Sequence, residues 1–95
     1  MTNTDISLPV ESIGSAPRAT VVPKLSLRER EVLLAWIRCD SKEEVRTVLG
    51  IALSTVNTHL FRIREKYDAV GRPAHTKAQL VARSLQDGWI TLGEL

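Results

Sequence analysis

Three segments of the chain begin with the same helix-initiating pattern, in which a Ser or Thr is followed three residues later by Glu or Gln. In such a capping box, each of the two side chains accepts a hydrogen bond from a backbone N–H at the start of the helix. Apolar residues at helical spacing follow each pair, so the pattern predicts that most of the chain forms short helices. The pairs are Ser26 with Glu29, Ser41 with Glu44, and Thr76 with Gln79.

The apolar spacing predicts an all-α fold of four helices, over about residues 27–38, 42–49, 55–68 and 77–87. Gly50 and Gly88 each follow a predicted helix and suit the left-handed turn that ends one. Trp89 and Ile90 are then expected to fold back over the core. In chain order, the side chains expected in the core are Val32, Leu33, Trp36, Ile37, Val45, Val48, Leu49, Val56, Leu60, Ile63, Tyr67, Ala78, Val81, Ala82 and Leu85.

The amino-terminal residues 1–24 lack a sustained apolar period and carry Ser, Thr, Pro and Gly, which predicts a flexible tail or the remnant of a linker. Residues 25–95 form the predicted domain, roughly 70 residues long and near the lower size for a core that folds unaided. Whether the chain is a complete small protein or a fragment of a larger regulator stays open. A deep catalytic cleft is not expected in a domain of this size.

The composition of the chain further limits the classes of protein to which it is expected to belong. Hydrophobic residues make up 43% and charged residues 25% of the chain, with a net charge of +2, which is typical of a soluble domain. The single cysteine, Cys39, and the absence of a long apolar run predict a cytoplasmic protein with no membrane segment. His59, His75 and Cys39 are too scattered for a metal site, and no cofactor is indicated. No catalytic residues are assigned, because nucleophile, base and orienting acid do not occur together, so an enzyme is not expected.

The second helix, the turn at Gly50 and the third helix have the layout of a helix-turn-helix, in which the longer helix presents its outer face to a DNA major groove. On that face Asn57 suits an adenine edge, Thr58 offers a hydroxyl or a methyl group, and Phe61 suits a thymine methyl. Arg62, Lys66 and Arg64 are candidates for neutralising phosphates. The competing interpretation is that these polar residues are simply the solvated side of the helix, although Phe61 is harder to explain that way.

The run LSLREREVLLAWIRCDSKEEVRTVLGIALSTVNTHLFRIREKY resembles the LuxR/FixJ-type (GerE-like) effector domain of bacterial transcription regulators. In that family, patterns similar to L-S/T-x-R-E-x-E-V-L, S-x-K-E-I-A and T-V-x-x-H-L-x-x-I-x-x-K-L begin the first helix, begin the second and form the recognition helix. The resemblance extends from Leu25 to Ile90 and implies a sequence-specific, double-stranded DNA-binding regulator. It also implies a response-regulator effector domain with its recognition helix at about residues 55–68.

By this resemblance, Asn57, Thr58 and Phe61 stand where family members contact bases. Contacts to the DNA backbone are expected from a second set of residues: Ser54, Thr55, His59, Arg62, Lys66 and Arg46. Arg46 replaces the small alanine of the family and is expected to point outward, towards phosphate. Ala52 replaces the usual Ser or Thr cap of the recognition helix, so Ser54 is expected to cap a shorter helix instead.

Such a small reading surface contacts few bases, so a homodimer on two adjacent half-sites is expected. The resemblance assigns the dimer contact to the fourth helix, with Lys77, Leu80, Val81 and Ser84 as candidates, and it leaves RNA polymerase open as a further partner. Two other interpretations stay open. One is a promoter-recognition module similar to region four of a bacterial sigma factor, and the other is a helical adaptor that binds a protein through the Phe61 side and no DNA.

Overall fold

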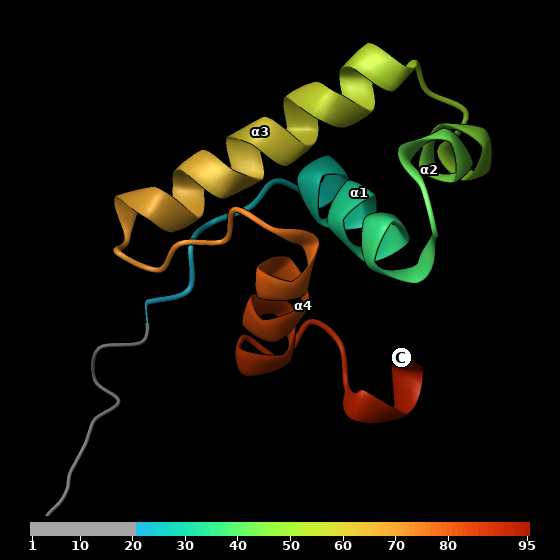
Figure 1. Ribbon diagram of the computed structural model, residues 1–95. Helices are drawn as coiled ribbons and strands as arrows, with labels where there is room; N and C mark the ends of the chain where they lie inside the picture. Colours follow the sequence, from blue (N-terminus) through green and yellow to red (C-terminus); the bar gives the residue numbers. More distant parts are fainter. Residues whose placement is uncertain (1–20) are drawn as a thin grey trace, which may run out of the picture.

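The computed structural model describes residues 21–95, and this part of the chain contains four α-helices and no strand (Figure 1). They are α1 (Leu27–Arg38), α2 (Lys42–Leu49), α3 (Leu53–Ala69) and α4 (Lys77–Gln86), followed by a short 3-10 helix, η3 (Leu92–Glu94). The all-α prediction is confirmed. Most of the predicted tail, residues 1–20, lies outside the described residues. Within residues 21–95, no helix is both long enough and apolar enough to cross a membrane.

The predicted capping boxes form at two of the three helix starts. Ser26 and Glu29 cap α1 reciprocally, and Thr76 and Gln79 do the same for α4. At α2 the Ser41 hydroxyl accepts from the Glu44 N–H at 3.2 Å, but the Glu44 carboxylate accepts from the N–H of Asp40, at 2.8 Å. Glu44 therefore reaches one residue further back and holds the turn between α1 and α2.

The start of α3 differs from the prediction. The helix begins at Leu53, with Ala52 in the capping position and no side-chain hydrogen bond there. Ser54 lies inside the first turn, because the N–H groups of Thr55 and Val56 already donate to the Ala52 carbonyl. The expectation that Ser54 caps a shorter helix was wrong, and α3 starts with its first amide donors lacking a side-chain cap.

A serine at position 52 should supply the missing cap. Because Ala52 already has the extended backbone of a capping residue, we expect Ala52→Ser to raise the free energy of unfolding by about 0.5–1 kcal/mol. The matched control is Ala82→Ser inside α4, where serine has a lower helix propensity and should cost up to about 0.5 kcal/mol. Urea unfolding followed by circular dichroism measures both. An Ala52→Ser variant no more stable than the wild-type chain would contradict the capping argument.

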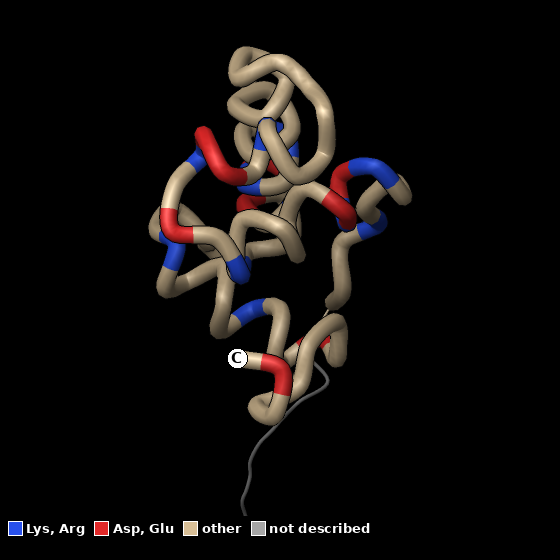
Figure 2. Tube along the Cα trace, turned by 90° about the vertical axis from the view of Figure 1, so that its right-hand side faces the viewer, with Lys and Arg blue, Asp and Glu red and all other residues tan. Residues whose placement is uncertain are grey.

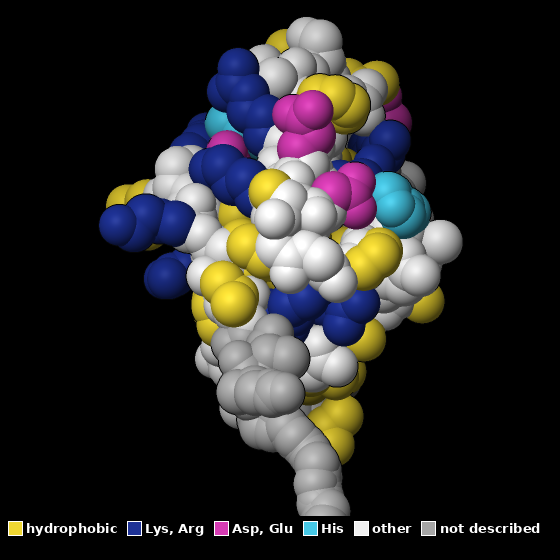
Figure 3. All heavy atoms as spheres, turned by 90° about the vertical axis from the view of Figure 1, so that its left-hand side faces the viewer, with side chains coloured by type: hydrophobic (Ala, Val, Ile, Leu, Met, Phe, Trp, Pro, Cys, Tyr) yellow, Lys and Arg dark blue, Asp and Glu magenta, His cyan; other side chains and the backbone are white. Residues whose placement is uncertain are grey.

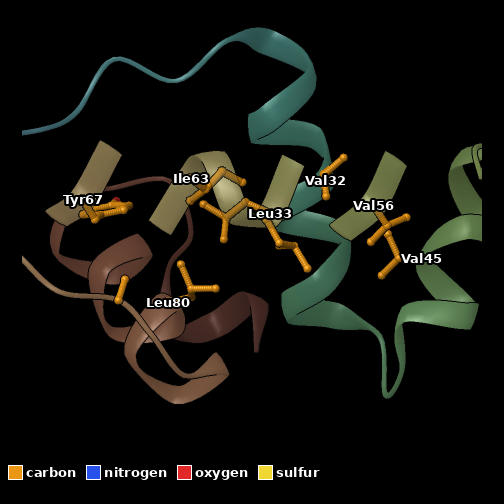
Figure 4. Packing of buried hydrophobic residues seen from close by; sticks show 9 residues of the cluster. Val32, Leu33, Val45, Val56, Ile63, Tyr67 and Leu80 are labelled. Atoms are coloured by element: carbon orange, nitrogen blue, oxygen red, sulfur yellow. The ribbon is translucent and has the colours of Figure 1, made fainter. Parts of the chain in front are cut away.

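The core lies where α1, α2 and α4 meet one side of α3 (Figure 4). Four α3 residues predicted for the core, Val56, Leu60, Ile63 and Tyr67, are all buried, and they form one apolar stripe that packs against side chains from the other helices. These contacts extend from Val56 to Tyr67 and anchor α3 over most of its length. The fully buried hydrophobic residues are Val32, Leu33, Val45, Val56, Leu60, Ile63, Tyr67, Ala74 and Leu80.

Two predicted core faces were misplaced. Val48 in α2 is 68% exposed, so only Val45 and part of Leu49 face inward. In α4 the side chains of Ala78 and Ala82 are exposed, whereas Leu80 and Ser84 are completely buried. Ser84 escapes the usual cost of burying a hydroxyl because it donates to the Leu80 carbonyl one turn earlier, at 2.8 Å. The core-facing side of α4 is therefore turned away from the predicted one.

A buried polar cluster joins the end of α3 to the end of α4. Arg72 binds the carboxylate of Asp87 through both terminal nitrogens, at 2.8 and 3.2 Å, and Tyr67 donates its hydroxyl to the same carboxylate at 2.6 Å. The Asp87 side chain is fully buried. Burial of the Tyr67 hydroxyl, and then its hydrogen bond to Asp87 and the charge of that carboxylate, raise the pKa of Tyr67. After this cluster Gly88 turns with a φ of +76°, and Trp89 and Ile90 fold back over the core as predicted.

Candidate nucleic-acid interface

The turn between α2 and α3 sets how α3 is presented. Gly50 adopts a left-handed conformation, with a φ of +67°, and its N–H and that of Ile51 donate to the carbonyl of Arg46. A residue with a β-carbon would strain this turn, so glycine allows the chain to reverse within three residues. In Figure 1, α1, α2 and α4 all lie on one side of α3, and its opposite side is uncovered in the described part of the chain.

The three residues predicted to contact bases lie on this uncovered side. Asn57 and Thr58 are exposed, and the Phe61 side chain is 59% exposed. The Asn57 amide has no hydrogen-bond partner among residues 21–95, so its donor and acceptor are both available to a ligand. The Thr58 hydroxyl donates to the Ser54 carbonyl at 2.9 Å, which leaves its oxygen as an acceptor and its methyl group for apolar contact.

Charge is distributed unevenly along α3. Residues 47–61 contain no Lys, Arg, Asp or Glu, and Figure 2 shows this uncharged stretch at the start of the helix. Charged side chains begin at Arg62, which is exposed and has no carboxylate within ion-pair distance in residues 21–95. Arg46, by contrast, is about half exposed and pairs with Glu43 at 3.3 Å. The helix thus presents neutral polar and aromatic groups first and cations one turn later.

The flank of α3 carries the remaining predicted contacts. Ser54 is exposed, whereas Thr55 and His59 are half-buried, and the His59 Nδ1 atom is buried without a hydrogen-bond partner. Arg64 lies on the other flank, also half-buried, with its Nε enclosed and unpartnered. None of these four side chains belongs to the core, so each keeps some surface towards solvent.

Lys66 is bound within the protein. Its ammonium donates to the Glu29 carboxylate at 2.6 Å and to the Lys24 carbonyl at 3.2 Å. Burial raises the pKa of Glu29, but the hydrogen bonds from Lys66 and Ser26 and the charge of Lys66 outweigh it and hold the pKa below its usual value. The stabilisation from this pair is therefore present above the usual glutamate pKa and is lost as the pH falls through the lower folded-state value.

Comparison with known proteins decides the family. The family model of bacterial regulatory proteins of the luxR family (GerE) matches residues 23–81, which is more than half of the chain. The chain belongs to the luxR family. The matched range contains α1, α2, α3 and the first half of α4. Searches of curated proteins and of solved structures each found no match.

Membership of the luxR family establishes the general function. Its members are DNA-binding, helix-turn-helix transcription regulators, so residues 23–81 are a DNA-binding domain of that general type. Within the matched range, α2, the turn at Gly50 and α3 have the helix, turn and helix layout expected from the sequence.

Most of the residues predicted for the dimer contact of this luxR-family domain are buried in the protomer or bound to other groups within it. Leu80 and Ser84 have no exposed surface, so they cannot contact a second copy, and both predictions were wrong. Lys77 donates to the Cys39 carbonyl and lies over the Trp36 ring, 4.4 Å from its centroid. Only Val81 is a partly exposed apolar side chain free of such contacts.

Sequence reasoning missed two features that support the interface. Glu29 was interpreted only as a cap, although it also holds Lys66, 37 positions away. Arg72 lies between the third and fourth predicted helices and was assigned no role, although it joins α3 to α4 and also binds the Val21 carbonyl at 2.8 Å. Neither contact has a local sequence pattern, because both partners come from distant parts of the chain.

Proposed function

We propose that this chain is a sequence-specific regulator that binds double-stranded DNA by inserting the outer face of α3 into the major groove. The observation that carries the proposal is the side of α3 opposite the core, which no other described helix covers and which presents Asn57, Thr58 and Phe61. A major groove is wide enough to admit an α-helix with such side chains. Anchored along its buried stripe, α3 would enter the groove without rearranging.

Base contacts are proposed for the uncharged part of this face. The Asn57 amide has a donor and an acceptor side by side, which matches the N6 and N7 atoms of adenine. Phe61 and the Thr58 methyl group would contact thymine methyls, which replaces water at two apolar surfaces. This combination favours A·T pairs within the DNA site.

Contacts to the DNA backbone are proposed for residues around that face. Arg62 is the strongest candidate, because it is exposed and has no described carboxylate partner to give up. Arg46 would have to exchange its exposed Glu43 partner for a phosphate, which costs little at the surface. Polar hydrogen bonds to the backbone are proposed for Ser54, Thr55 and His59. Such contacts fix the orientation of the helix but read no sequence.

Two matched variants test this division of roles. Arg62→Ala should weaken binding to every sequence and reduce the slope of log Kobs against log salt by about 0.9, the contribution of one phosphate contact. Asn57→Ala should leave that slope unchanged and lose about 1–3 kcal/mol of discrimination at one base position. Fluorescence anisotropy on a DNA selected from a random pool, and on a scrambled DNA, measures both quantities across a range of salt concentrations.

The control for these variants is Arg38→Ala, which removes an exposed arginine at the end of α1, paired with Glu94 at 3.5 Å. It should bind DNA as the wild-type chain does. Equal losses on all sequences from Arg62→Ala and Asn57→Ala would contradict the division of roles. If neither variant changed DNA binding at low salt but both abolished a protein complex, the chain would be a protein-binding adaptor instead.

A homodimer on DNA is proposed through the outward side of α4, in place of the buried residues predicted from the sequence. This side presents exposed Ala78 and Ala82 beside the half-buried Val81 and Leu85. Small side chains let two helices approach closely, and the neighbouring apolar surface would be removed from water on contact. Since the set lies away from the outer face of α3, two copies could join and still reach adjacent half-sites.

Ala82→Glu tests this surface without touching the core. A carboxylate buried in a helix–helix contact is costly, so affinity for DNA with two half-sites should fall at least about tenfold. Affinity for a single half-site should stay unchanged, as measured by anisotropy, and analytical ultracentrifugation should show one copy per DNA. Leu92→Glu, at a side chain that is 77% exposed on η3, is the control. An Ala82→Glu variant that still binds as a dimer would exclude this side of α4.

A further inference from the structure

The residues that lead into α1 are fastened to α3 and α4. We call residues 21–24 the approach segment. The Val21 carbonyl accepts from Arg72 at 2.8 Å, the Lys24 carbonyl accepts from Lys66 at 3.2 Å, and Pro23 is buried between these two points. Figure 1 shows the segment passing alongside α3 before α1 begins. Its backbone is thus fixed beside the part of α3 that carries Arg62 and Lys66.

Lys66 cannot easily serve as a phosphate ligand itself. Its partner Glu29 has a side chain only 5% exposed, at 2.6 Å from the ammonium. Moving the ammonium to a phosphate would leave a buried carboxylate without its counter-charge, which is a costly state. The ammonium also binds the Lys24 carbonyl, so two of its three donors are already used within the domain.

Lys24 is in the opposite situation. It is exposed, and no carboxylate in residues 21–95 lies within ion-pair distance of it. Its carbonyl is held by Lys66, which lies one helical turn after Arg62 on the same flank of α3. Figure 3 looks onto this end of the molecule and shows several Lys and Arg side chains at its left edge, with others at the centre and on the right. Lys24 can therefore extend along the same edge as Arg62.

We propose that the approach segment is a second DNA-contacting element, in which Lys24 binds a phosphate beside the groove occupied by α3. Lys66 is a positioning residue, since it fixes the backbone from which Lys24 extends. The inference rests on the proposed function, because it requires α3 to lie in the groove. A fixed backbone makes the contact cheaper, since only the Lys24 side chain has to be ordered on binding.

Lys24→Ala in the full chain, measured against the DNA selected above, is the primary test. The slope of log Kobs against log salt should fall by about 0.9, with the base preference and the unfolding temperature unchanged. An unchanged salt slope would overturn the proposal. Arg38→Ala is again the control for loss of an exposed cation away from the proposed interface.

The positioning role of Lys66 is tested in a background that leaves no buried charge, Glu29→Gln with Lys66→Gln. If Lys66 fixes the approach segment, adding Lys24→Ala to this background should change the salt slope by clearly less than 0.9. A full effect there would leave Lys24 as a phosphate contact and remove the role of Lys66.

Arg62→Ala separates this inference from the proposed function. If Arg62→Ala reduces the slope and Lys24→Ala does not, only the approach-segment proposal fails. If the wild-type chain shows no salt-dependent DNA binding at all, the proposed function fails and this inference fails with it.

Discussion

Asp87→Ala should lower the free energy of unfolding by about 3–5 kcal/mol, the usual cost of breaking a buried ion pair from one side. The fully buried Asp87 carboxylate accepts from Arg72 and Tyr67, so its loss leaves a buried guanidinium and a phenol hydroxyl without their acceptor. A domain of this size has only about 5–15 kcal/mol in total, so much of its stability depends on this carboxylate. Chemical unfolding followed by circular dichroism gives the difference directly.

Two further variants show whether the loss of stability in Asp87→Ala comes from breaking the buried ion pair. Tyr67→Phe removes only one hydrogen bond to Asp87 and should cost about 1 kcal/mol. Glu94→Ala removes an exposed ion pair with Arg38 and should cost less than about 1 kcal/mol. If Asp87→Ala costs no more than Glu94→Ala, the buried cluster does not hold the ends of α3 and α4 together.

Phe61→Glu should reduce DNA affinity by about 100-fold without changing stability. The Phe61 side chain is 59% exposed and outside the core, so the folded protein loses little when it is replaced. On the DNA, however, the carboxylate would replace an apolar contact, which is worth up to about 1.5–3 kcal/mol when a Phe side chain is fully buried, and would face phosphates of the same charge. Anisotropy at low salt measures the affinity, and thermal unfolding measures the stability.

Leu92→Glu places the same charge on another exposed apolar residue, away from the proposed interface, and should bind DNA normally. Phe61→Ala should lie between the wild-type chain and Phe61→Glu, because it loses the contact without adding charge. A Phe61→Glu variant that binds like the wild-type chain would mean that the outer face of α3 does not contact DNA.

The helices could be predicted from the sequence because their starts are set locally. A cap and its partner are three residues apart, so Ser26 and Thr76 identify the start of a helix without knowledge of the rest of the fold. The apolar spacing that predicts the α3 stripe is also a local pattern, and its four apolar residues are all buried. The outer face followed from the same periodicity, since it is the side opposite the stripe.

The features that could not be predicted from the sequence depend on residues far apart in the chain or on polar groups buried in the core. Ser84 was interpreted as a surface residue, because nothing in its type indicates that its hydroxyl bonds back to its own helix. Together with Leu80, which is also fully buried, Ser84 shows that the core-facing side of α4 differs from the predicted one. Lys66 was interpreted as a phosphate contact, because the sequence does not show that Glu29, in another helix, is its ion-pair partner. The sequence identified the charge but not the group that neutralises it.

Chemical modification of the selected DNA tests most directly whether the outer face of α3 enters the major groove. Methylation of guanine N7 and replacement of thymine by uracil change only major-groove atoms, whereas methylation of adenine N3 changes the minor groove. If α3 lies in the major groove, the first two modifications will weaken binding, and the uracil effect at one position will disappear in Phe61→Ala. Binding that is blocked by adenine N3 methylation alone, or by none of the three, would contradict it.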